Sequence, residues 1–441
     1  MALRKICAGN VRRNRRNMKK RKWSAACVCM MLSVLPFSGC GQQKTTEYVP
    51  NTAVPTAMEE TPVIDYSLPA LTPNVLVDRY GYGTEEKKEA VLKGKRLPKV
   101  FSLVDAESGE TVYSGRVTEV VYLEKQEIYV GTADFSQADV TGRVYLRCAY
   151  IGESYPFWIE DDFYQELFGE TCEELLESCR SHTLETEEAV TLLQAYEWYP
   201  DIFPDENKNE IPDILEELKE WVAYREENGV SASEEALYAA FLAKFSYTYQ
   251  KFSFSYATDC LKRASTVFGQ VQNTLNKSAD IFCALAELYR ATGLQAYGKQ
   301  LLEYESYFTN NSTYLEETAY LYGAMTYLVT RQKVDMDLCD IIMKRLMERA
   351  EEISSCYEEM IHPVTARNDG SEDLLKNARI VSCANYCMNN YQYTNIGEDF
   401  LHYLMGCNLE SVDFYGEAEQ KTGYLLLLAQ LAGKNSSFKE K

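Results

Sequence analysis

Four side chains in the middle of the chain have the types and the spacing of a calcium-binding loop. Asp205, Asn207 and Asn209 alternate along a polar stretch and Glu216 follows, so that they occupy positions 1, 3, 5 and 12 of an EF-hand-like loop. Glu210 stands where that loop needs glycine for its sharp turn. The residues therefore favour a solvated corner that caps a helix, and calcium at this loop is the alternative.

The histidines and cysteines do not form a second site of this kind. His182, His362 and His402 share no ligand spacing, so each is expected to be a surface or packing histidine. Beyond residue 40, the cysteines lie mostly on apolar helical faces without CxxC spacing, a pattern that does not indicate zinc. Their scatter favours free, buried thiols over disulfides. These cysteines are Cys148, Cys172, Cys179, Cys260, Cys283, Cys339, Cys356, Cys383, Cys387 and Cys407.

Length and charge limit the class of protein and of partner. The chain has 441 residues, enough for two or three domains that each bury a core. Residues 1–39 carry ten Lys and Arg and no acid, so removing them lowers the net charge from −21 to −31. A body this acidic repels phosphate backbones, which excludes nucleic acid as the expected partner.

The N-terminus has the pattern of an export signal. A basic run is followed by an apolar stretch, residues 23–37, that is too short and interrupted for a typical membrane-spanning helix. It ends in Leu-Pro-Phe-Ser-Gly-Cys40, which resembles a bacterial lipoprotein processing site. We expect residues 1–39 to be a signal peptide and Cys40 to be lipidated, which places the protein on the extracellular face of a bacterial membrane. An uncleaved signal anchor is the alternative.

Three further regions follow in order. Residues 40–73 contain five of the twelve prolines and are expected to be a flexible linker. Residues 74–160 are rich in short β-branched and aromatic runs separated by turn signals, which predicts an immunoglobulin-like β-sandwich. The expected strands are residues 75–77, 90–92, 100–104, 111–113, 128–130, 142–148 and 155–159.

From residue 161 the apolar residues recur at helical spacing as far as residue 433, before a short tail, residues 434–441. About twelve helices with short connectors fit either an (α/α)6 toroid or an α-solenoid, although no fixed repeat is present. The expected helices lie near residues 161–179, 185–199, 212–228, 233–250, 255–274, 278–292, 295–308, 313–330, 336–353, 371–390, 396–406 and 416–432.

Several fragments resemble family 9 glycoside hydrolases, which mostly cleave cellulose. Val-Asp-Arg-Tyr-Gly-Tyr at 77–82 looks like the opening strand and turn of the Ig-like domain that precedes many of their catalytic domains. Residues 101–110, 132–136, 142–145 and 155–159 continue that resemblance in order.

The helical part carries the same resemblance. The corner at residues 199–221 resembles the loop and helix that follow the family's catalytic loop. Ala-Leu-Ala-Glu-Leu-Tyr-Arg-Ala-Thr-Gly at 284–293 looks like a mid-barrel helix, and residues 400–408 resemble a late helix. Together the fragments cover residues 74–433 and imply a multidomain chain, an Ig-like β-sandwich followed by an all-α (α/α)6 toroid. We expect a monomer that binds a polysaccharide or oligosaccharide.

The residues that perform the family's chemistry are missing. Active members invert the anomeric carbon with an Asp base and a Glu acid, and the base lies in an Asp-Ala-Gly-Asp motif between the first two barrel helices. Here Cys179–Leu184 joins those helices without an Asp, and the family's His-His-Arg loop after Asn408 is absent. We therefore expect a degenerate, weak or inactive member. An active hydrolase with a relocated base is the alternative.

Glu417 is the candidate that the resemblance offers for the general acid. It stands near the expected start of the last helix, roughly where the family carries its acid, although Glu419 competes for the position. The other interpretation is an acid that stabilises the first helical turn through the helix dipole.

The chain is also rich in tyrosine, with 33 residues, and rings on helical faces could stack on sugars. Packing between helices is the more common role for such rings, and we expect it here. The tyrosines in question are Tyr238, Tyr247, Tyr249 and Tyr256.

Overall fold

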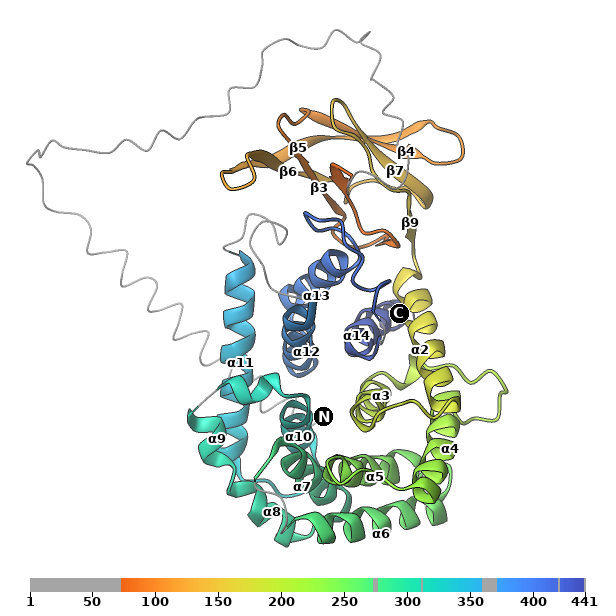
Figure 1. The fold of residues 1–441 in the computed structure, drawn as a ribbon, viewed down its shortest axis with the longest axis vertical. Coiled ribbons are helices and arrows are strands. Elements are labelled where there is room, and N and C mark those ends of the chain that lie inside the picture. Colours follow the sequence, from red (N-terminus) through yellow and green to blue (C-terminus); the bar gives the residue numbers. More distant parts are fainter. Residues whose placement is uncertain (1–72, 273–276, 311, 359–370, 419–420, 440–441) are drawn as a thin grey trace, which may run out of the picture. The chain divides into compact units, whose positions relative to one another are not determined.

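The computed structural model describes residues 73–272, 277–310, 312–358, 371–418 and 421–439, and all of them belong to one compact unit, Ile64–Lys441 (Figure 1). The expected signal peptide, the lipidation site at Cys40, His362 and Glu419 lie outside the described residues.

The first part of the unit is a β-sandwich. One sheet has the order β1-β3-β6-β5 and the other β5-β4-β7-β9-β2, with β8 beside β7 and the long strand β5 shared by both. All neighbouring strands are antiparallel except β2 and β9. The strands are β1 (Val75–Leu76), β2 (Gly81–Gly83), β3 (Glu89–Gly94), β4 (Val100–Asp105), β5 (Thr111–Leu123), β6 (Ile128–Asp134), β7 (Gly142–Cys148), β8 (Gly152–Glu153) and β9 (Phe157–Glu160).

Alternating side chains build the core of this sandwich. Val144, Leu146 and Cys148 point inward from β7, while the residues between them are more exposed. The prediction that the strand beginning at residue 111 ends at residue 113 is wrong, because β5 continues to Leu123. β5 pairs with β4 as far as Arg116 and with β6 from Val117 onward, so it passes from one sheet to the other at that point, and periodicity does not reveal this change of partner. A bulge follows within the β5–β6 pairing, between Thr118 and Val121.

The second part consists of helix pairs in which an outer helix is followed by an inner one. The outer helices are α2 (Phe163–Arg180), α4 (Asp213–Asn228), α6 (Phe254–Val271), α8 (Gln295–Leu302) with α9 (Glu305–Asn310), α11 (Met336–Glu358) and α13 (Tyr391–Leu404). The inner helices are α3 (Thr186–Trp198), α5 (Glu235–Tyr249), α7 (Ala279–Thr292), α10 (Thr318–Val329), α12 (Ser371–Met388) and α14 (Thr422–Lys439). Short 3-10 turns lie at Pro200–Ile202 (η1) and Ser312–Glu316 (η2).

The inner helices form a ring. Each of α5, α7, α10 and α3 packs on its neighbour, and α14 joins α3 to α12, as Figure 1 shows. Nearly every residue of α5 and α10 is buried, because these helices are covered on all sides. The predicted (α/α)6 arrangement is confirmed.

Several helix boundaries differ from the predicted ones. The single helix predicted at 295–308 is two, because the chain turns at Glu303 and buries Tyr304. Helix α10 begins at Thr318 rather than at residue 313, since a 3-10 turn precedes it.

The later helices differ as well. Helix α11 extends to Glu358, and α13 begins at Tyr391, where the Asn390 side chain accepts the N–H of Gln392. The last helix runs from Thr422 to Lys439 rather than from residue 416 to 432, so most of the predicted tail at 434–441 is helical.

The sandwich contacts the helical part through a buried group of charged side chains. His402 on α13 places Nδ1 2.8 Å from Asp78 Oδ2 and Nε2 3.5 Å from Glu86 Oε1. Asp78 also accepts the backbone N–H groups of Tyr80 and Gly81. Burial disfavours a protonated His402, but the two carboxylates outweigh burial and raise its pKa well above the usual value. His402 is therefore a cation between two buried acids.

Replacing His402 with Gln should lower the free energy of unfolding by about 3–5 kcal/mol near pH 7, because Asp78 and Glu86 then remain buried without a cation. Since the pKa is raised in the folded state, this contribution is complete below the unfolded pKa of about 6.5 and is lost as the pH rises through the folded pKa. Urea denaturation of both proteins across this range measures the effect.

His182→Gln is the matched control for this experiment, because His182 is exposed and stacks on Tyr224. It should change stability by less than about 1 kcal/mol. Equal losses in His402→Gln and His182→Gln would show that the buried contact contributes nothing specific.

Candidate functional site

The N-terminal ends of the inner helices gather acidic side chains at one end of the ring. Each inner helix follows an outer helix that runs the opposite way, so all of the inner helices begin at the same end. The Thr422 hydroxyl at the start of α14 donates to Glu188 in the first turn of α3, at 2.7 Å. Glu187, Asp280 and Glu317, named here the rim acids, lie in the first turns or N-caps of α3, α7 and α10. Helix dipoles favour acids at these positions.

One arginine lies among the rim acids. Arg379 on α12 donates to the Thr318 hydroxyl at 2.8 Å, and its Nη1 lies 3.9 Å from Glu187 Oε1. These contacts connect α12 to α10 and α3 across the end of the ring. Because Glu187 and Glu317 are exposed, their carboxylates can also reach a ligand in solvent.

The environments of the rim acids differ. Burial raises the pKa of Asp280, and the charges of Glu187 and Glu317 raise it further. Enzymes that use two carboxyl groups divide the acid and base roles between groups whose environments differ in this way. The rim acids therefore supply hydrogen-bond acceptors, and Asp280 holds its proton more readily than an ordinary aspartate does.

A tyrosine cluster lies beside the rim acids, between α7 and α10. Tyr304, Tyr307, Tyr314 and Tyr320 pack against one another with ring centroids 5.0–6.3 Å apart. The Tyr304 hydroxyl reaches the carbonyl of Ser278 just before α7. Tyr307 and Tyr314 are half-buried, so part of each ring faces solvent. Rings of this kind offer flat apolar surface next to polar groups.

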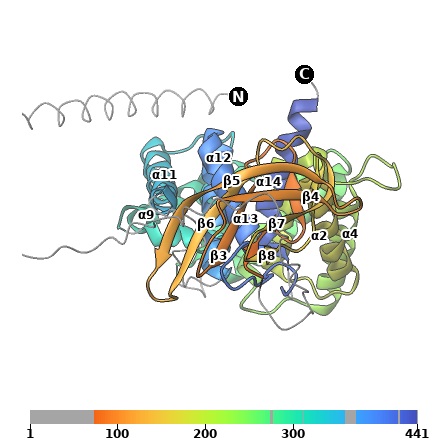
Figure 2. The ribbon, with the colours of Figure 1, turned by 90° about the horizontal axis from the view of Figure 1, so that it is seen from above.

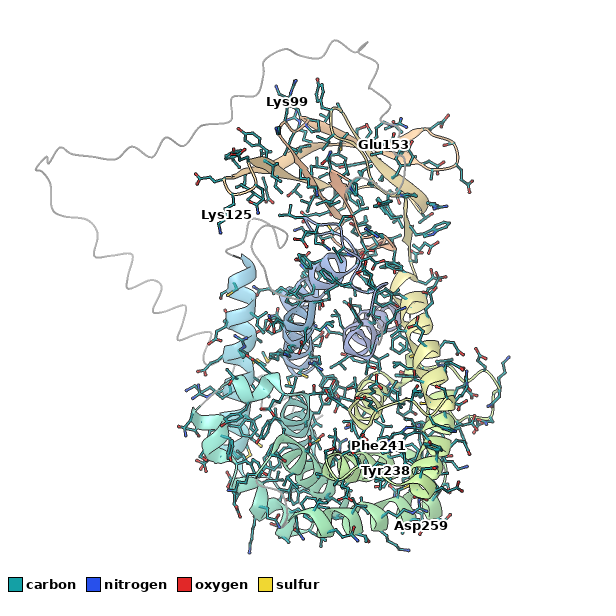
Figure 3. All side chains as sticks on the ribbon, in the orientation of Figure 1. Lys99, Lys125, Glu153, Tyr238, Phe241 and Asp259 are labelled. Atoms are coloured by element: carbon teal, nitrogen blue, oxygen red, sulfur yellow. The ribbon has the colours of Figure 1, made fainter. Side chains whose placement is uncertain are left out.

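The tyrosine cluster is not among the tyrosines singled out in the sequence, which are Tyr238, Tyr247, Tyr249 and Tyr256. The structure confirms packing for those four. Tyr238, labelled in Figure 3, and Tyr249 are buried. Tyr256 packs on Tyr249, and the Tyr247 hydroxyl donates to Glu287. The density of tyrosine at residues 304–320 is the signal that points to the cluster.

The connection between α2 and α3 is a tight turn. The N–H groups of Thr183 and Leu184 both bond to the carbonyl of Ser178, and the Leu184 carbonyl accepts the indole N–H of Trp221 at 3.1 Å. The chain therefore passes from α2 into α3 without an excursion, and no carboxylate lies between Arg180 and Leu184.

Glu417 does not lie where the sequence placed it. It is exposed in the turn that follows Asp413, five residues before α14, and its N–H bonds to the carbonyl of Asp413. The interpretation of Glu417 as an acid in the first helical turn is therefore wrong. Its carboxylate makes no hydrogen bond or ion pair to another described residue, and its proposed acid role stays a prediction.

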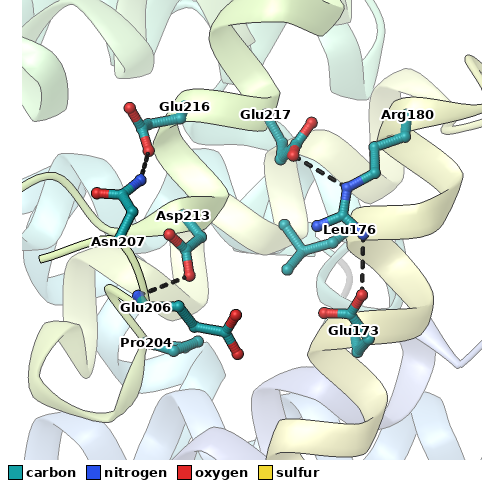
Figure 4. Close-up of a pocket in the computed structure, with 9 residues that line it drawn as sticks. All are labelled: Glu173, Leu176, Arg180, Pro204, Glu206, Asn207, Asp213, Glu216 and Glu217. Atoms are coloured by element: carbon teal, nitrogen blue, oxygen red, sulfur yellow. Dashed lines mark hydrogen bonds and ion pairs between the residues drawn. The ribbon is translucent and has the colours of Figure 1, made fainter.

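Two of the four calcium candidates, Asn207 and Glu216, line a pocket of about 200 Å³ on the outside of the ring, with five carboxylates in its lining (Figure 4). Arg180 pairs there with Glu173 and Glu217. The residues that line it are Glu173, Leu176, Arg180, Pro204, Glu206, Asn207, Asp213, Glu216 and Glu217.

The structure brings the four predicted ligands together but satisfies them internally. The side-chain amides of Asn207 and Asn209 donate to Glu216 at 2.7 and 2.9 Å, and Asp205 accepts the backbone N–H groups of Asn209 and Glu210. Amide N–H groups thus occupy positions that a cation would need. Among the described residues, no group of three or more His, Cys, Asp and Glu side chains is placed to hold a metal ion. The loop is therefore described by its internal hydrogen bonds as a helix-capping corner.

The opposite end of the inner ring carries a buried ion cluster. Lys244, 1% exposed, lies 2.7 Å from Glu197 and 3.2 Å from Glu287, and Arg290 pairs with Glu197 at 2.5 Å. Burial disfavours the charged form of Lys244, but the two glutamates outweigh it and raise its pKa. The Tyr247 hydroxyl donates to Glu287 at 2.7 Å. Because its members bond mainly to one another, this cluster is structural.

Most of the described cysteines are free, buried thiols, as the sequence predicts. Cys148, Cys172, Cys179, Cys260, Cys283, Cys383 and Cys407 are buried and free, whereas Cys356 is exposed. Burial raises the pKa of Cys148 to about 12, which makes that thiol unreactive. No helix of the described residues has the length and apolar content that crossing a membrane requires.

Calcium should not stabilise the protein. A metal at 100 times its dissociation constant adds about 2.7 kcal/mol, which raises Tm by several degrees in a chain of this size. Melting in 5 mM EDTA and in about 5 mM calcium should give the same Tm, because Glu216 already has two amide partners. A rise in Tm that grows with calcium concentration and disappears in Glu216→Ala would contradict this.

Comparisons with known proteins match both parts of the chain. Residues 70–153 match the family described as the cellulase N-terminal ig-like domain. No curated protein sequence matches the chain. Several solved structures share this fold, among them the following three.

A metagenome-derived glycoside hydrolase family 9 endoglucanase is 18% identical, with a TM-score of 0.64 over 77% of this chain and 84% of its own. A family 9 protein of Bacteroides ovatus is 13% identical, with a TM-score of 0.65 over 83% of this chain and 100% of its own. AaCel9A, solved with a cellobiose-like isofagomine, is 15% identical, with a TM-score of 0.63 over 77% of this chain and 84% of its own. The chain thus carries a cellulase-type Ig-like domain and has the fold of the family 9 endoglucanases.

Proposed function

We propose that this protein binds a β-glucan-like polysaccharide or oligosaccharide at the rim acids and the tyrosine cluster, with little or no hydrolysis. The fold similarity supports a glycan ligand, since AaCel9A was solved with a cellobiose-like compound. The observation that carries the proposal is the tyrosine cluster beside the rim acids. Half-exposed rings stack on sugar faces, and carboxylates accept hydrogen bonds from sugar hydroxyls.

The expectation of little or no hydrolysis rests on the turn between α2 and α3. An inverting hydrolase needs a base on the far side of the sugar from its acid, with room for a water molecule between them. The turn at Arg180–Leu184 contributes no carboxylate, and its backbone is fixed by hydrogen bonds to Ser178. Losing water activation typically removes about 10²–10⁴ of rate.

A second candidate function is an active hydrolase whose acid and base have moved to the rim acids. The raised pKa of Asp280 beside Glu187 and Glu317 favours it, because a general acid must hold its proton near neutral pH. In that case Asp280 is the acid, and Glu187 or Glu317 is the base.

The export proposal is separate from the glycan site. Cys40 is proposed to be the lipidated mature N-terminus, which tethers the body through the linker at residues 40–73 to the extracellular face of a bacterial membrane.

Glycan binding should depend on the tyrosine cluster. Tyr314→Ala is expected to weaken binding of cello-oligosaccharides about tenfold, since removing a stacked ring costs more than about 1 kcal/mol. Tyr122→Ala, which removes a tyrosine that is 44% exposed on the sandwich, should leave affinity unchanged. Isothermal titration calorimetry of both variants decides this. If Tyr314→Ala binds like the wild type, the cluster is not the binding site.

Hydrolysis of soluble cellulose derivatives, xylan and mixed-linkage glucan by residues 64–441 should be negligible. The assay includes Glu417→Gln and Asp280→Asn in parallel, measured by reducing-end release. Turnover that disappears in Glu417→Gln would show that Glu417 acts as the general acid. Turnover that vanishes only in Asp280→Asn would establish the relocated pair.

Mass spectrometry of the membrane-extracted protein should show Cys40 as a modified N-terminal residue. Cys40→Ser should abolish both the modification and membrane retention. An N-terminus elsewhere, with Cys40 unmodified, would end the lipoprotein proposal.

A further inference from the structure

One face of the β-sandwich is turned away from the helices. The sheet β1-β3-β6 places Leu76, Val91 and Val130 against Cys407, which follows α13. The other sheet, with β4, β7 and β9, buries its inner side in the sandwich core and leaves its outer side in solvent. Figure 2 looks onto the sandwich from the side opposite the helices.

A line of arginine and aromatic side chains runs along this outer side. Arg143, Tyr145 and Arg147 alternate on β7 with the inward residues and therefore share a face, about 7 Å apart along the strand. Trp158 on β9 is paired directly with Arg143 and is 44% exposed. These four residues are named here the arginine strip.

Neighbouring strands extend the same face. Ser102 on β4 pairs with Arg147, and its hydroxyl lies 3.4 Å from that of Ser114 on β5. Arg116, two residues further along β5 and exposed, therefore points to the same side. The face thus carries hydroxyl groups between arginines.

The strip is basic although the chain is acidic. Arg147 is paired with Glu153 at 2.7 Å, and its guanidinium lies 5.3 Å from the Tyr145 ring centroid. Arg143 and Arg116 are exposed and make no ion pair with a described residue. The chain as a whole carries −21, but charges more than about 8–10 Å away are screened at physiological ionic strength. A polymer at this face therefore meets the local arginines first.

We propose that the arginine strip binds an anionic polysaccharide of the uronate type. Arginine holds carboxylates in a planar, two-pronged contact, and tryptophan presents a flat apolar ring to a sugar face. Trp158 beside Arg143 supplies both contacts within one sugar unit of each other, while Ser102 and Ser114 supply hydroxyl partners. This surface is independent of the proposed glycan site at the rim acids, whose carboxylates repel the same polymer.

The occupant is a polysaccharide rather than a lipid surface. Membrane-binding faces combine several mobile cations with apolar side chains that enter the bilayer. Here Arg147 is fixed by Glu153 and donates to the Tyr145 hydroxyl, and the exposed aliphatic side chains on this face, Val100 and Val112, are small. The regular spacing of side chains along the strands matches an extended chain of sugar units better than a headgroup layer.

The test uses the full-length protein, purified in detergent, in affinity electrophoresis with polygalacturonate. The wild type should be retarded by the polymer, and less so as salt rises. Arg143→Gln combined with Trp158→Ala should weaken binding about tenfold or more, and Arg143→Gln alone should produce part of that loss without changing the buried core of the sandwich. A thermal melt of each variant confirms that it is folded.

Two control variants remove the same chemistry elsewhere. Lys125→Gln deletes an exposed cation at the β5–β6 turn, on another part of the sandwich from Glu153 (Figure 3). Phe254→Ala deletes a ring that is 69% exposed on α6. Both should bind within about twofold of the wild type.

Four outcomes would overturn the proposal. They are no retardation by polygalacturonate, equal retardation of the double variant, equal loss in the controls, and tighter binding to phosphatidylglycerol vesicles than to the polymer. Cello-oligosaccharide binding is measured separately. If it is kept in the arginine-strip variants and lost in Tyr314→Ala, it reports on the tyrosine cluster alone and leaves the arginine-strip proposal standing.

Discussion

Burial of His402 between Asp78 and Glu86 is the contact on which the arrangement of the described chain depends. The three groups come from α13 and from the segment around β2, so neither domain can satisfy them alone. Their contact fixes the chain that follows α13. The Arg79 N–H bonds to the carbonyl of Met405, and the Tyr80 hydroxyl bonds to Asp413 at 3.0 Å. The β-sandwich therefore holds the connection that leads to Glu417 and into α14, and a domain that contributes no rim acid still determines how the last inner helix begins.

Local pattern in the sequence accounts for most elements but not for their ends or for contacts between them. Strand β7 and helix α3 were predicted nearly to the residue, because apolar residues alternate along the strand and recur at helical spacing along the helix. The sequence does not show that β5 crosses between sheets, because the change of partner between Arg116 and Val117 depends on two other strands. The role of His402 could not be predicted for the same reason. Its partners Asp78 and Glu86 are more than 300 residues away in the sequence and meet it only in the folded chain. The rim acids were missed because they meet only when distant helices close the ring, whereas the absence of a carboxylate at Arg180–Leu184 could be read directly.

The inner helices differ at their two ends. Acids lie at the N-terminal ends of α3, α7 and α10, where helix dipoles favour them, and Arg290 lies in the last turn of α7, where the dipole favours a cation. At the C-terminal end the charges are buried and bonded to one another, so they fix the register of α3, α5 and α7. At the N-terminal end Glu187 and Glu317 remain exposed, and one arginine serves the rim acids. Ion pairs among its own side chains thus close one end, whereas the other end keeps carboxylates available.

The two proposed glycan surfaces would select different polymers for electrostatic reasons. The rim acids place carboxylates around a half-exposed tyrosine cluster, so a uronate there faces like charge, whereas a neutral glucan offers hydroxyl donors and apolar ring faces. The arginine strip reverses this preference, because Arg143 beside Trp158 attracts a carboxylate and stacks the sugar that carries it. A protein with both surfaces can hold an acidic wall or matrix polymer by its sandwich while a neutral chain lies at the ring. Neither proposed contact requires a catalytic base, so binding at these surfaces does not depend on a carboxylate in the turn between α2 and α3.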